Sequence, residues 1–261
     1  MTREQNIEYV IRELQAMNGT AVPVPESLVD RQRLMRALMN IWQPQTLSDE
    51  FLRAQDRELQ AQREERIQTA SLTEHRVQTD LPESRMSVVQ ADITTLAVDA
   101  IVNAANSQML GCFQPLHACI DNAIHSAAGL QLRQECNEIM QSRELPTGEA
   151  VITRGYNLPA RHVIHTVGPI YGMQPKRVSE MALTACYRNC LNLAAEHGLT
   201  SIAFCCISTG VFGYPQDEAA QIAVHTIREW LSAHKEVLIN VIFCTYKDED
   251  YERYQRLTTG A

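Results

Sequence analysis

Two cysteines and a histidine lie close together in the middle of the chain, as Cys112, His117 and Cys119. Thiolate sulfur and imidazole nitrogen are ligands that zinc prefers, and the spacing Cys-x4-His-x-Cys gathers three of them within eight residues. Three protein ligands leave a fourth position open for water or a substrate, whereas a purely structural zinc usually has four protein ligands. The spacing therefore predicts a zinc site of the catalytic kind.

An alternative is that these two thiols are buried in a hydrophobic core, where cysteine is often found. Gly111, Pro115 and the break in hydrophobic periodicity around them favour a loop over a packed strand. No fourth ligand is visible beside the three, so the spacing alone leaves both interpretations open.

A short apolar strand is expected before this loop, at residues 100–102, and a helix after it, at residues 121–128, with Gly129 as the C-terminal cap. The turn that follows the strand carries Asn103 and Asn106, whose amides can bond the hydroxyls of a ribose. Because asparagine also favours turns for its own conformational reasons, this pair alone is a weak signal.

Strands and helices alternate from about residue 77 onward. Strands are expected at 86–90, 100–102, 150–153, 162–166, 201–207 and 237–244, and helices at 121–128, 181–193, 216–234 and 248–257. This alternation predicts an α/β fold with a mixed or mostly parallel sheet covered on both faces. In such folds, ligands bind beyond the carboxyl ends of the strands.

Two further strand ends carry polar or glycine-rich segments. Asp92 follows the strand at 86–90, and its carboxylate can accept a hydrogen bond from an amino group such as that of adenine; it can equally serve as an N-cap for the next turn. Residues 208–214 read Ser-Thr-Gly-Val-Phe-Gly-Tyr before a helix, and their backbone N–H groups can cradle a diphosphate. An isolated glycine-rich turn is more often only a turn. The three strand ends together, however, favour a nucleoside-diphosphate ligand.

The first 72 residues show helical patterns and no visible chemistry. Apolar stripes at helical spacing occur at 7–14 and 34–42, and Ser48 is a suitable N-cap for a third helix. The charged run at 57–66 is expected to be a solvated face. We therefore expect an all-helical extension, residues 1–72, packed against an α/β domain of residues 73–261, with docking of a partner as the alternative role of the extension.

The composition narrows the possible partners. The chain has 261 residues, 45% of them hydrophobic, and a net charge of −8. Residues 1–70 carry nine Lys/Arg and eleven Asp/Glu, which leaves fourteen and twenty for the remainder, so neither part has a basic surface for nucleic acid. The sequence predicts no membrane span and no signal peptide. Eight cysteines in such a chain are expected to be reduced thiols, as in a cytoplasmic protein.

Several segments, taken together, resemble the macrodomain family, which binds ADP-ribose. They are Ala91-Asp92-Ile93-Thr94, Val98-Asp99-Ala100-Ile101-Val102-Asn103-Ala104-Ala105-Asn106, Ile120-Asp121-Asn122-Ala123-Ile124-His125, Ala128-Gly129, His165-Thr166-Val167-Gly168-Pro169 and Ser208 to Tyr214. The resemblance covers about residues 77–261. It implies a three-layer α/β/α macrodomain with a mixed central sheet, preceded by the helical extension.

One departure points to a particular branch of this family. Hydrolytic macrodomains usually carry a run of glycines where this chain has residues 112–119. The chain is similar to the zinc-containing branch, whose members also carry an N-terminal helical extension and remove ADP-ribose from proteins. The resemblance thus implies one Zn²⁺ per chain, an ADP-ribosylated protein as substrate and ADP-ribose as product. In some bacteria and fungi, such enzymes are linked to a sirtuin-type ADP-ribosyltransferase and a lipoylated carrier protein.

The resemblance also implies a set of site residues. Cys112, His117 and Cys119 would hold the metal, Asn106 would fix the distal ribose, and Asp121 would orient substrate or water, so that Asn106, Asp121 and His117 take part in hydrolysis of mono-ADP-ribose. ADP-ribose would be bound by Asp92, Ile93, Asn106, Cys119, Ile120, Asp121, Asn122, Ser208, Thr209, Gly210, Val211 and Phe212.

Other interpretations stay open for the same residues. Asp121 can be the N-cap of its helix, and it can fill both roles. The protein can instead be a reader that binds ADP-ribose without cutting it, or the zinc can be purely structural. We expect the remaining candidates to be buried and inert packing residues: His125, Cys186, Cys190, Cys205, Cys206 and Cys244.

Overall fold

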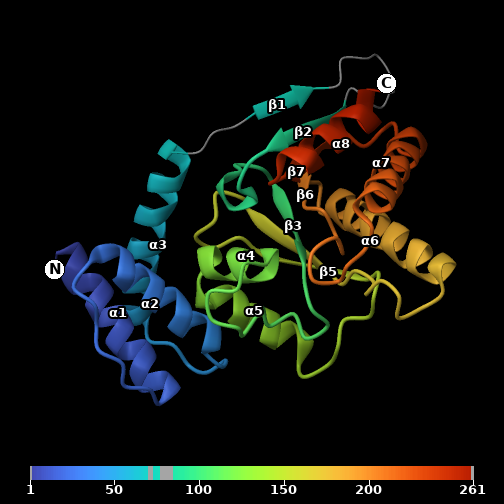
Figure 1. The fold of residues 1–261 in the computed structure, drawn as a ribbon. Coiled ribbons are helices and arrows are strands. Elements are labelled where there is room, and N and C mark those ends of the chain that lie inside the picture. Colours follow the sequence, from blue (N-terminus) through green and yellow to red (C-terminus); the bar gives the residue numbers. More distant parts are fainter. Residues whose placement is uncertain (1, 70–72, 77–84, 260–261) are drawn as a thin grey trace.

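The structure, a computed structural model, describes residues 2–69, 73–76 and 85–259. Its centre is a seven-stranded sheet in the order β1-β2-β7-β6-β3-β5-β4 (Figure 1). The strands are β1 Thr73–Arg76, β2 Met86–Gln90, β3 Ala100–Ala104, β4 Ala150–Arg154, β5 His162–Thr166, β6 Ser201–Phe204 and β7 Asn240–Thr245. The five central strands are parallel, and the edge strands β1 and β4 are antiparallel to their neighbours. The sheet is therefore mixed, as expected.

Helices cover both faces of the sheet. α4 (Ile120–Ala128) and α5 (Leu130–Met140) lie on one side, and α6 (Lys176–Glu196), α7 (Gln216–Ala233) and α8 (Asp248–Thr259) pack in a row on the other (Figure 1). The predicted three-layer α/β/α arrangement is confirmed. Sequence patterns did not predict α5 or β1.

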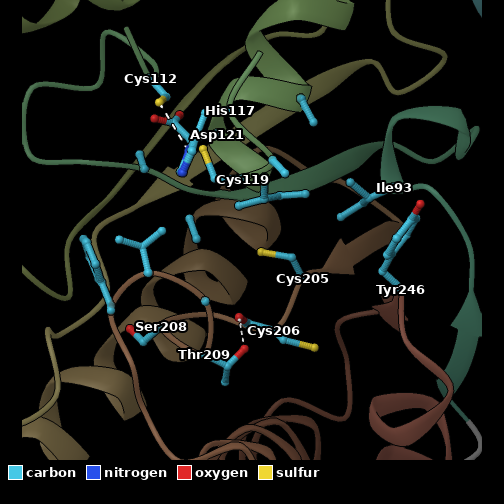
Figure 2. A pocket seen from close by; sticks show the side chains of 18 of the residues that line it. Ile93, Cys112, His117, Cys119, Asp121, Cys205, Cys206, Ser208, Thr209 and Tyr246 are labelled. Carbon is cyan, nitrogen blue, oxygen red and sulfur yellow. Dashed lines mark hydrogen bonds between the residues drawn. The ribbon is translucent and has the colours of Figure 1, made fainter. Parts of the chain in front are cut away.

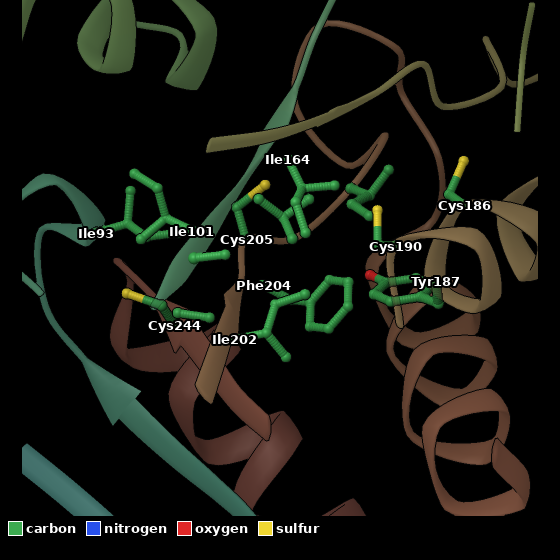
Figure 3. Packing of buried hydrophobic residues seen from close by; sticks show 14 of the residues in the cluster. Ile93, Ile101, Ile164, Cys186, Tyr187, Cys190, Ile202, Phe204, Cys205 and Cys244 are labelled. Atoms are coloured by element: carbon green, nitrogen blue, oxygen red, sulfur yellow. The ribbon is translucent and has the colours of Figure 1, made fainter. Parts of the chain in front are cut away.

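The core between the sheet and the α6–α8 layer is tightly packed. Tyr187 of α6 contacts Phe204 of β6 with ring centroids 5.1 Å apart. Cys186 and Cys190 lie on the same buried helix face and are fully shielded from solvent (Figure 3). Burial raises the pKa of both thiols, so these two cysteines act as packing residues, as expected.

The N-terminal extension has a small hydrophobic core of its own. Its helices are α1 (Arg3–Asn18), α2 (Leu28–Ile41) and α3 (Asp49–Thr69). Apolar residues of all three surround the fully buried Trp42, and Leu130 from the start of α5 completes this cluster. The extension thus packs on the α4–α5 side of the domain (Figure 1).

The charged run of α3 was predicted to be a solvated face, and this prediction is wrong for part of it. Gln60 and Arg63 both bond Asn157 of the α/β domain, and Glu58 is fully buried. The domain boundary predicted between residues 72 and 73 adjoins residues outside the described ones. None of the described helices is long and apolar enough to span a membrane.

Four strands have bounds that differ from the prediction: β4 runs to Arg154, one residue further, β7 spans Asn240–Thr245 instead of 237–244, and β3 and β6 differ at their carboxyl ends. β3 extends to Ala104, so Asn103 lies inside a strand, and β6 ends at Phe204, so Cys205 and Cys206 follow the strand. β3 pairs with β6 only at its first two residues, Ala100 and Ile101, and the two strands therefore diverge toward their carboxyl ends. This divergence makes room for a cleft.

Candidate active site at the carboxyl edge of the sheet

A cleft of about 750 Å³ opens at the carboxyl ends of β2, β7, β6 and β3. Its volume is in the range of small-molecule sites, and the place matches the rule for parallel sheets. Figure 2 shows Cys112, His117 and Cys119 at one end of this cleft and Ile93 and Tyr246 at the other. The strand ends that looked unusual in the sequence therefore converge on one site.

Cys112, His117 and Cys119 come together as the spacing predicted. Their ligand atoms all lie within 4.8 Å of one another, and Cys112 Sγ is 3.6 Å from His117 Nδ1. Tetrahedral zinc bonds of about 2.3 Å to sulfur and about 2.0 Å to nitrogen separate two such ligands by about 3.5 Å. The donor set and this spacing fit a zinc ion.

Cys119 also begins α4. Its Sγ accepts a hydrogen bond from Asn122 N at 3.4 Å, so Cys119, and not Asp121, is the N-cap. Burial raises the pKa of the Cys119 thiol to about 11, and the neighbouring Cys112 and Asp121 raise it too. Because acidic groups crowd here, a divalent cation would favour their ionised forms.

The extension holds in place the loop of residues 111–119, which carries the three candidate ligands and is called the metal loop below. Asn40 of α2 accepts a hydrogen bond from Leu116 N at 2.9 Å, where Leu116 has a left-handed φ of 57°. The same Asn40 side chain donates to Ser126 of α4 at 3.0 Å. Asn122 donates from Nδ2 to Gln114 O at 3.0 Å. The loop is thus tied to both α2 and α4.

Asp121 is a buried carboxylate held by two asparagines. Asn103 donates to its Oδ1 at 2.8 Å and Asn106 donates to its Oδ2 at 3.2 Å. Burial raises the pKa of Asp121 to about 6, against the opposing effects of Asn103 and Arg133. Asn103 does not line the cleft, contrary to the expectation that it bonds ribose; it supports Asp121 from within β3.

His125 packs beneath the site, as predicted. It is buried, and its Nε2 lies 3.6 Å from Asp121 Oδ1. Gly111 of the metal loop passes over its ring: a Cβ at Gly111 would lie 2.8 Å from Cγ of His125, and its φ is +77°. A side chain at this position would push the loop off α4.

Asp92 is an N-cap, one of its two predicted roles, and it also lines the cleft. Its Oδ1 accepts hydrogen bonds from Thr94 N and Oγ1, which makes it the N-cap of the short helix η2 (Ile93–Thr95). Its Oδ2 lies 3.9 Å from Arg66 Nη1 of α3, and the residue lines the cleft. The carboxylate is therefore oriented by its own turn and by the extension.

The loop after β6 forms the opposite wall. Ser208 has a left-handed φ of 66°, which is unusual for a residue with a side chain. Its Oγ is buried and has no hydrogen-bond partner among the described residues. Such an unsatisfied donor in a cleft is suited to a ligand oxygen.

Most of the predicted ADP-ribose-binding residues line this cleft: Asp92, Ile93, Asn106, Cys119, Ile120, Asp121, Ser208, Thr209, Gly210, Val211 and Phe212. Asn122 is not among the lining residues; it is fully buried, and its side chain bonds α2 and the metal loop.

Other cleft residues went unpredicted. Cys205, Cys206 and Cys244, expected inside buried strands, contribute to the cleft wall, and burial raises the pKa of each thiol. Arg36 and Tyr246 also line it. Tyr246 directly follows β7, so a strand-end rule applied to every strand would have found it, whereas no sequence pattern marks Arg36.

Comparison with known proteins shows the family of this three-layer domain. A family model described as Macro domain matches residues 102–223. A protein-ADP-ribose hydrolase of Treponema medium is 47% identical over 254 residues, which are 96% of this chain and 95% of that protein. The chain therefore belongs to the macro domain family.

Two solved structures share the fold. A macrodomain of Oceanobacillus iheyensis with ADP is 40% identical, with a TM-score of 0.63, and the match covers 72% of this chain and 95% of that one. A Trypanosoma brucei macrodomain in complex with ADP-ribose is 38% identical, with a TM-score of 0.62, over 70% of this chain and 73% of that one.

Proposed function

We propose that this protein is a hydrolase that removes mono-ADP-ribose from modified proteins with a zinc ion held by Cys112, His117 and Cys119. One observation carries the proposal: the three ligands lie in the wall of the cleft beside the buried carboxylate of Asp121. The full-length likeness to a protein named protein-ADP-ribose hydrolase supports the activity.

The proposed binding mode runs along the cleft. Adenine lies at the end formed by Asp92, Ile93 and Tyr246, and the diphosphate lies over the loop of residues 208–212. The distal ribose then reaches Asn106 and Asp121, beside the metal ligands. The macrodomains solved with ADP and with ADP-ribose support this choice of ligand.

Asp121 is suited to handle a proton at the scissile bond. A carboxyl with a pKa of about 6 is mostly ionised at neutral pH and can accept a proton from the water that attacks the anomeric carbon of the distal ribose. Asn103 and Asn106 hold this carboxylate before the substrate arrives, which limits reorganisation during the reaction. The zinc would supply a Lewis acid there, able to polarise a ribose oxygen or lower the pKa of a bound water toward roughly 7.

The identity of the modified protein rests on the family resemblance alone. In this proposal it is a lipoylated carrier protein that a sirtuin-type transferase has modified.

Release of ADP-ribose from a mono-ADP-ribosylated protein tests the proposal. We expect about one zinc per chain, loss of turnover after chelation and recovery when zinc is restored. His117→Ala should abolish turnover while binding of free ADP-ribose falls much less, the signature of an interaction made mainly in the transition state. The exposed His225 provides the matched control, His225→Ala, which should behave like the wild type.

Two results contradict the proposal in different ways. Full turnover by metal-free protein would remove zinc from the mechanism. Tight binding of ADP-ribose without any release from modified proteins would make the protein a reader.

A further inference from the structure

Among the described residues of the extension, Arg36 is the one that lines the cleft. It lies on α2 and lines the same cleft as Asp92 and Cys119. Its half-buried guanidinium donates two hydrogen bonds to Asn122 Oδ1, from Nε at 3.2 Å and from Nη2 at 2.8 Å. Asn122 in turn bonds the metal loop, so Arg36 is held firmly against the beginning of α4.

The charge of Arg36 has no counter-charge in direct contact. Across the described part of the chain it forms no ion pair within 4.0 Å, and its hydrogen-bond acceptor is a neutral amide. Other arginines of the protein differ, since Arg161 pairs with Asp99 at 3.0 Å. A cation partly removed from water without a partner is unfavourable, so this position favours an anionic occupant.

The place of Arg36 indicates which part of a ligand it meets. Its charge is within electrostatic range of Cys119, at the metal end of the cleft, and of Asp92, at the opposite end. In ADP-ribose, the diphosphate is the anionic link between the two ends. The Nη1 group makes no hydrogen bond with another described residue, and a guanidinium is well suited to phosphate oxygens.

We propose that Arg36 binds the diphosphate of ADP-ribose, so that the helical extension completes the substrate site. This inference rests on the proposed function for the identity of the ligand, but it concerns binding and not hydrolysis. It gives the extension a direct role in recognition. The competing explanation is that Arg36 only positions Asn122, and through it the metal loop.

Comparing the binding of ADP-ribose with that of adenosine distinguishes these two explanations. ADP-ribose and adenosine share the adenine and its ribose, but adenosine has no phosphate. Arg36→Gln should raise the dissociation constant for ADP-ribose about tenfold or more, as expected for loss of a charged hydrogen bond. Its affinity for adenosine, measured by NMR titration, should stay within about twofold. Arg36→Lys should be intermediate, because lysine keeps the charge and loses the planar fork.

The salt dependence of ADP-ribose affinity is an independent test of the proposed charge contact. Affinity of the wild type for ADP-ribose should fall as salt rises, and the slope should be shallower for Arg36→Gln because one charge contact is missing. Arg33→Gln is the matched control: it is exposed on the same helix, does not line the cleft and changes the net charge equally. It should match the wild type in both affinity and salt slope.

The possible outcomes are distinct. Equal losses for adenosine and ADP-ribose would reduce Arg36 to a positioning residue, and unchanged ADP-ribose affinity in both folded variants would remove it from the site; either overturns the inference alone. A wild-type protein that binds ADP-ribose but releases none from modified proteins overturns the proposed function alone. A wild-type protein that does not bind ADP-ribose overturns both.

Discussion

In the proposed binding mode, the carboxylate of Asp92 serves as a helix cap and as a ligand group at the same time. Oδ1 accepts hydrogen bonds from Thr94, whereas Oδ2 lies 3.9 Å from Arg66 Nη1. A capping residue that is also a ligand group is held in one orientation before the ligand arrives, which reduces the entropy lost on binding.

Asp92→Ala should weaken binding of free ADP-ribose by about 1.5–3 kcal/mol, since a charge-assisted hydrogen bond to the adenine amino group is lost. Asp92→Asn is the control for the cap, because asparagine is also a good N-cap; it should lose a similar amount of affinity, because its Nδ2 donor replaces the acceptor Oδ2. Calorimetry measures both. Unchanged affinity in a folded Asp92→Ala protein would exclude Asp92 from the adenine site.

At the scale of the elements, Arg133 joins α5 to the end of α2. This residue of α5 is only 2% exposed, and its Nη1 donates to the carbonyls of Met39, Asn40 and Trp42 at the end of α2. Its guanidinium also lies 4.4 Å from the ring centroid of Phe113 in the metal loop. Arg133 thus satisfies helix-end carbonyls and connects the extension, α5 and the metal loop.

Arg133→Met should lower the free energy of unfolding by about 2–4 kcal/mol, because the carbonyls at the end of α2 lose a charged, buried donor. Urea denaturation measures the change. Arg188→Met is the matched control, since Arg188 is exposed on α6, and it should leave the midpoint nearly unchanged. Equal midpoints for both variants would show that the extension is held by its apolar contacts alone.

At the scale of the whole molecule, we expect buried histidines to make the fold sensitive to acid. His165 of β5 is fully buried; its Nδ1 accepts from Asn103, so Nε2 is left to donate to Thr153 Oγ1 at 3.0 Å. Burial lowers the pKa of His165 to about 3 from its ordinary value of 6.5. Burial lowers the pKa of His125 as well.

The sign of the pH dependence follows from these shifts. Below pH 6.5 the unfolded chain binds a proton at His165 and the folded protein does not, so stability is present above that pH and is lost as the pH falls. The contribution of His165 should be about 1.4 kcal/mol per pH unit below about pH 6. His165→Gln should therefore show a shallower loss of unfolding free energy between about pH 6 and about pH 5 than the wild type.

Urea unfolding at several pH values measures these slopes. The exposed His225 gives the control, His225→Gln, which should keep the wild-type slope. A slope in His165→Gln identical to that of the wild type would mean that other groups cause the acid sensitivity.

Much of the fold was predictable from local patterns. Hydrophobic runs identified the strands at 86–90 and 162–166 with their observed bounds, and Gly129 ended its helix where expected. β1 and α5 were missed. β1 is a polar edge strand of four residues, and α5 mixes buried Arg133 and Cys136 among its apolar positions. The burial of α5 depends on partners far away in the chain.

The sequence by itself determined that Cys112, His117 and Cys119 cluster, because they lie in one short loop where spacing already limits their separation. It also determined the α/β class and most of the strand ends that line the cleft. Only the tertiary structure decided that Asn103 donates to Asp121, that Asn122 bonds the metal loop, and that Arg36 lines the cleft. Those roles depend on which face a side chain presents and on how α2 docks against α4, and such long-range packing leaves no periodic pattern in the chain.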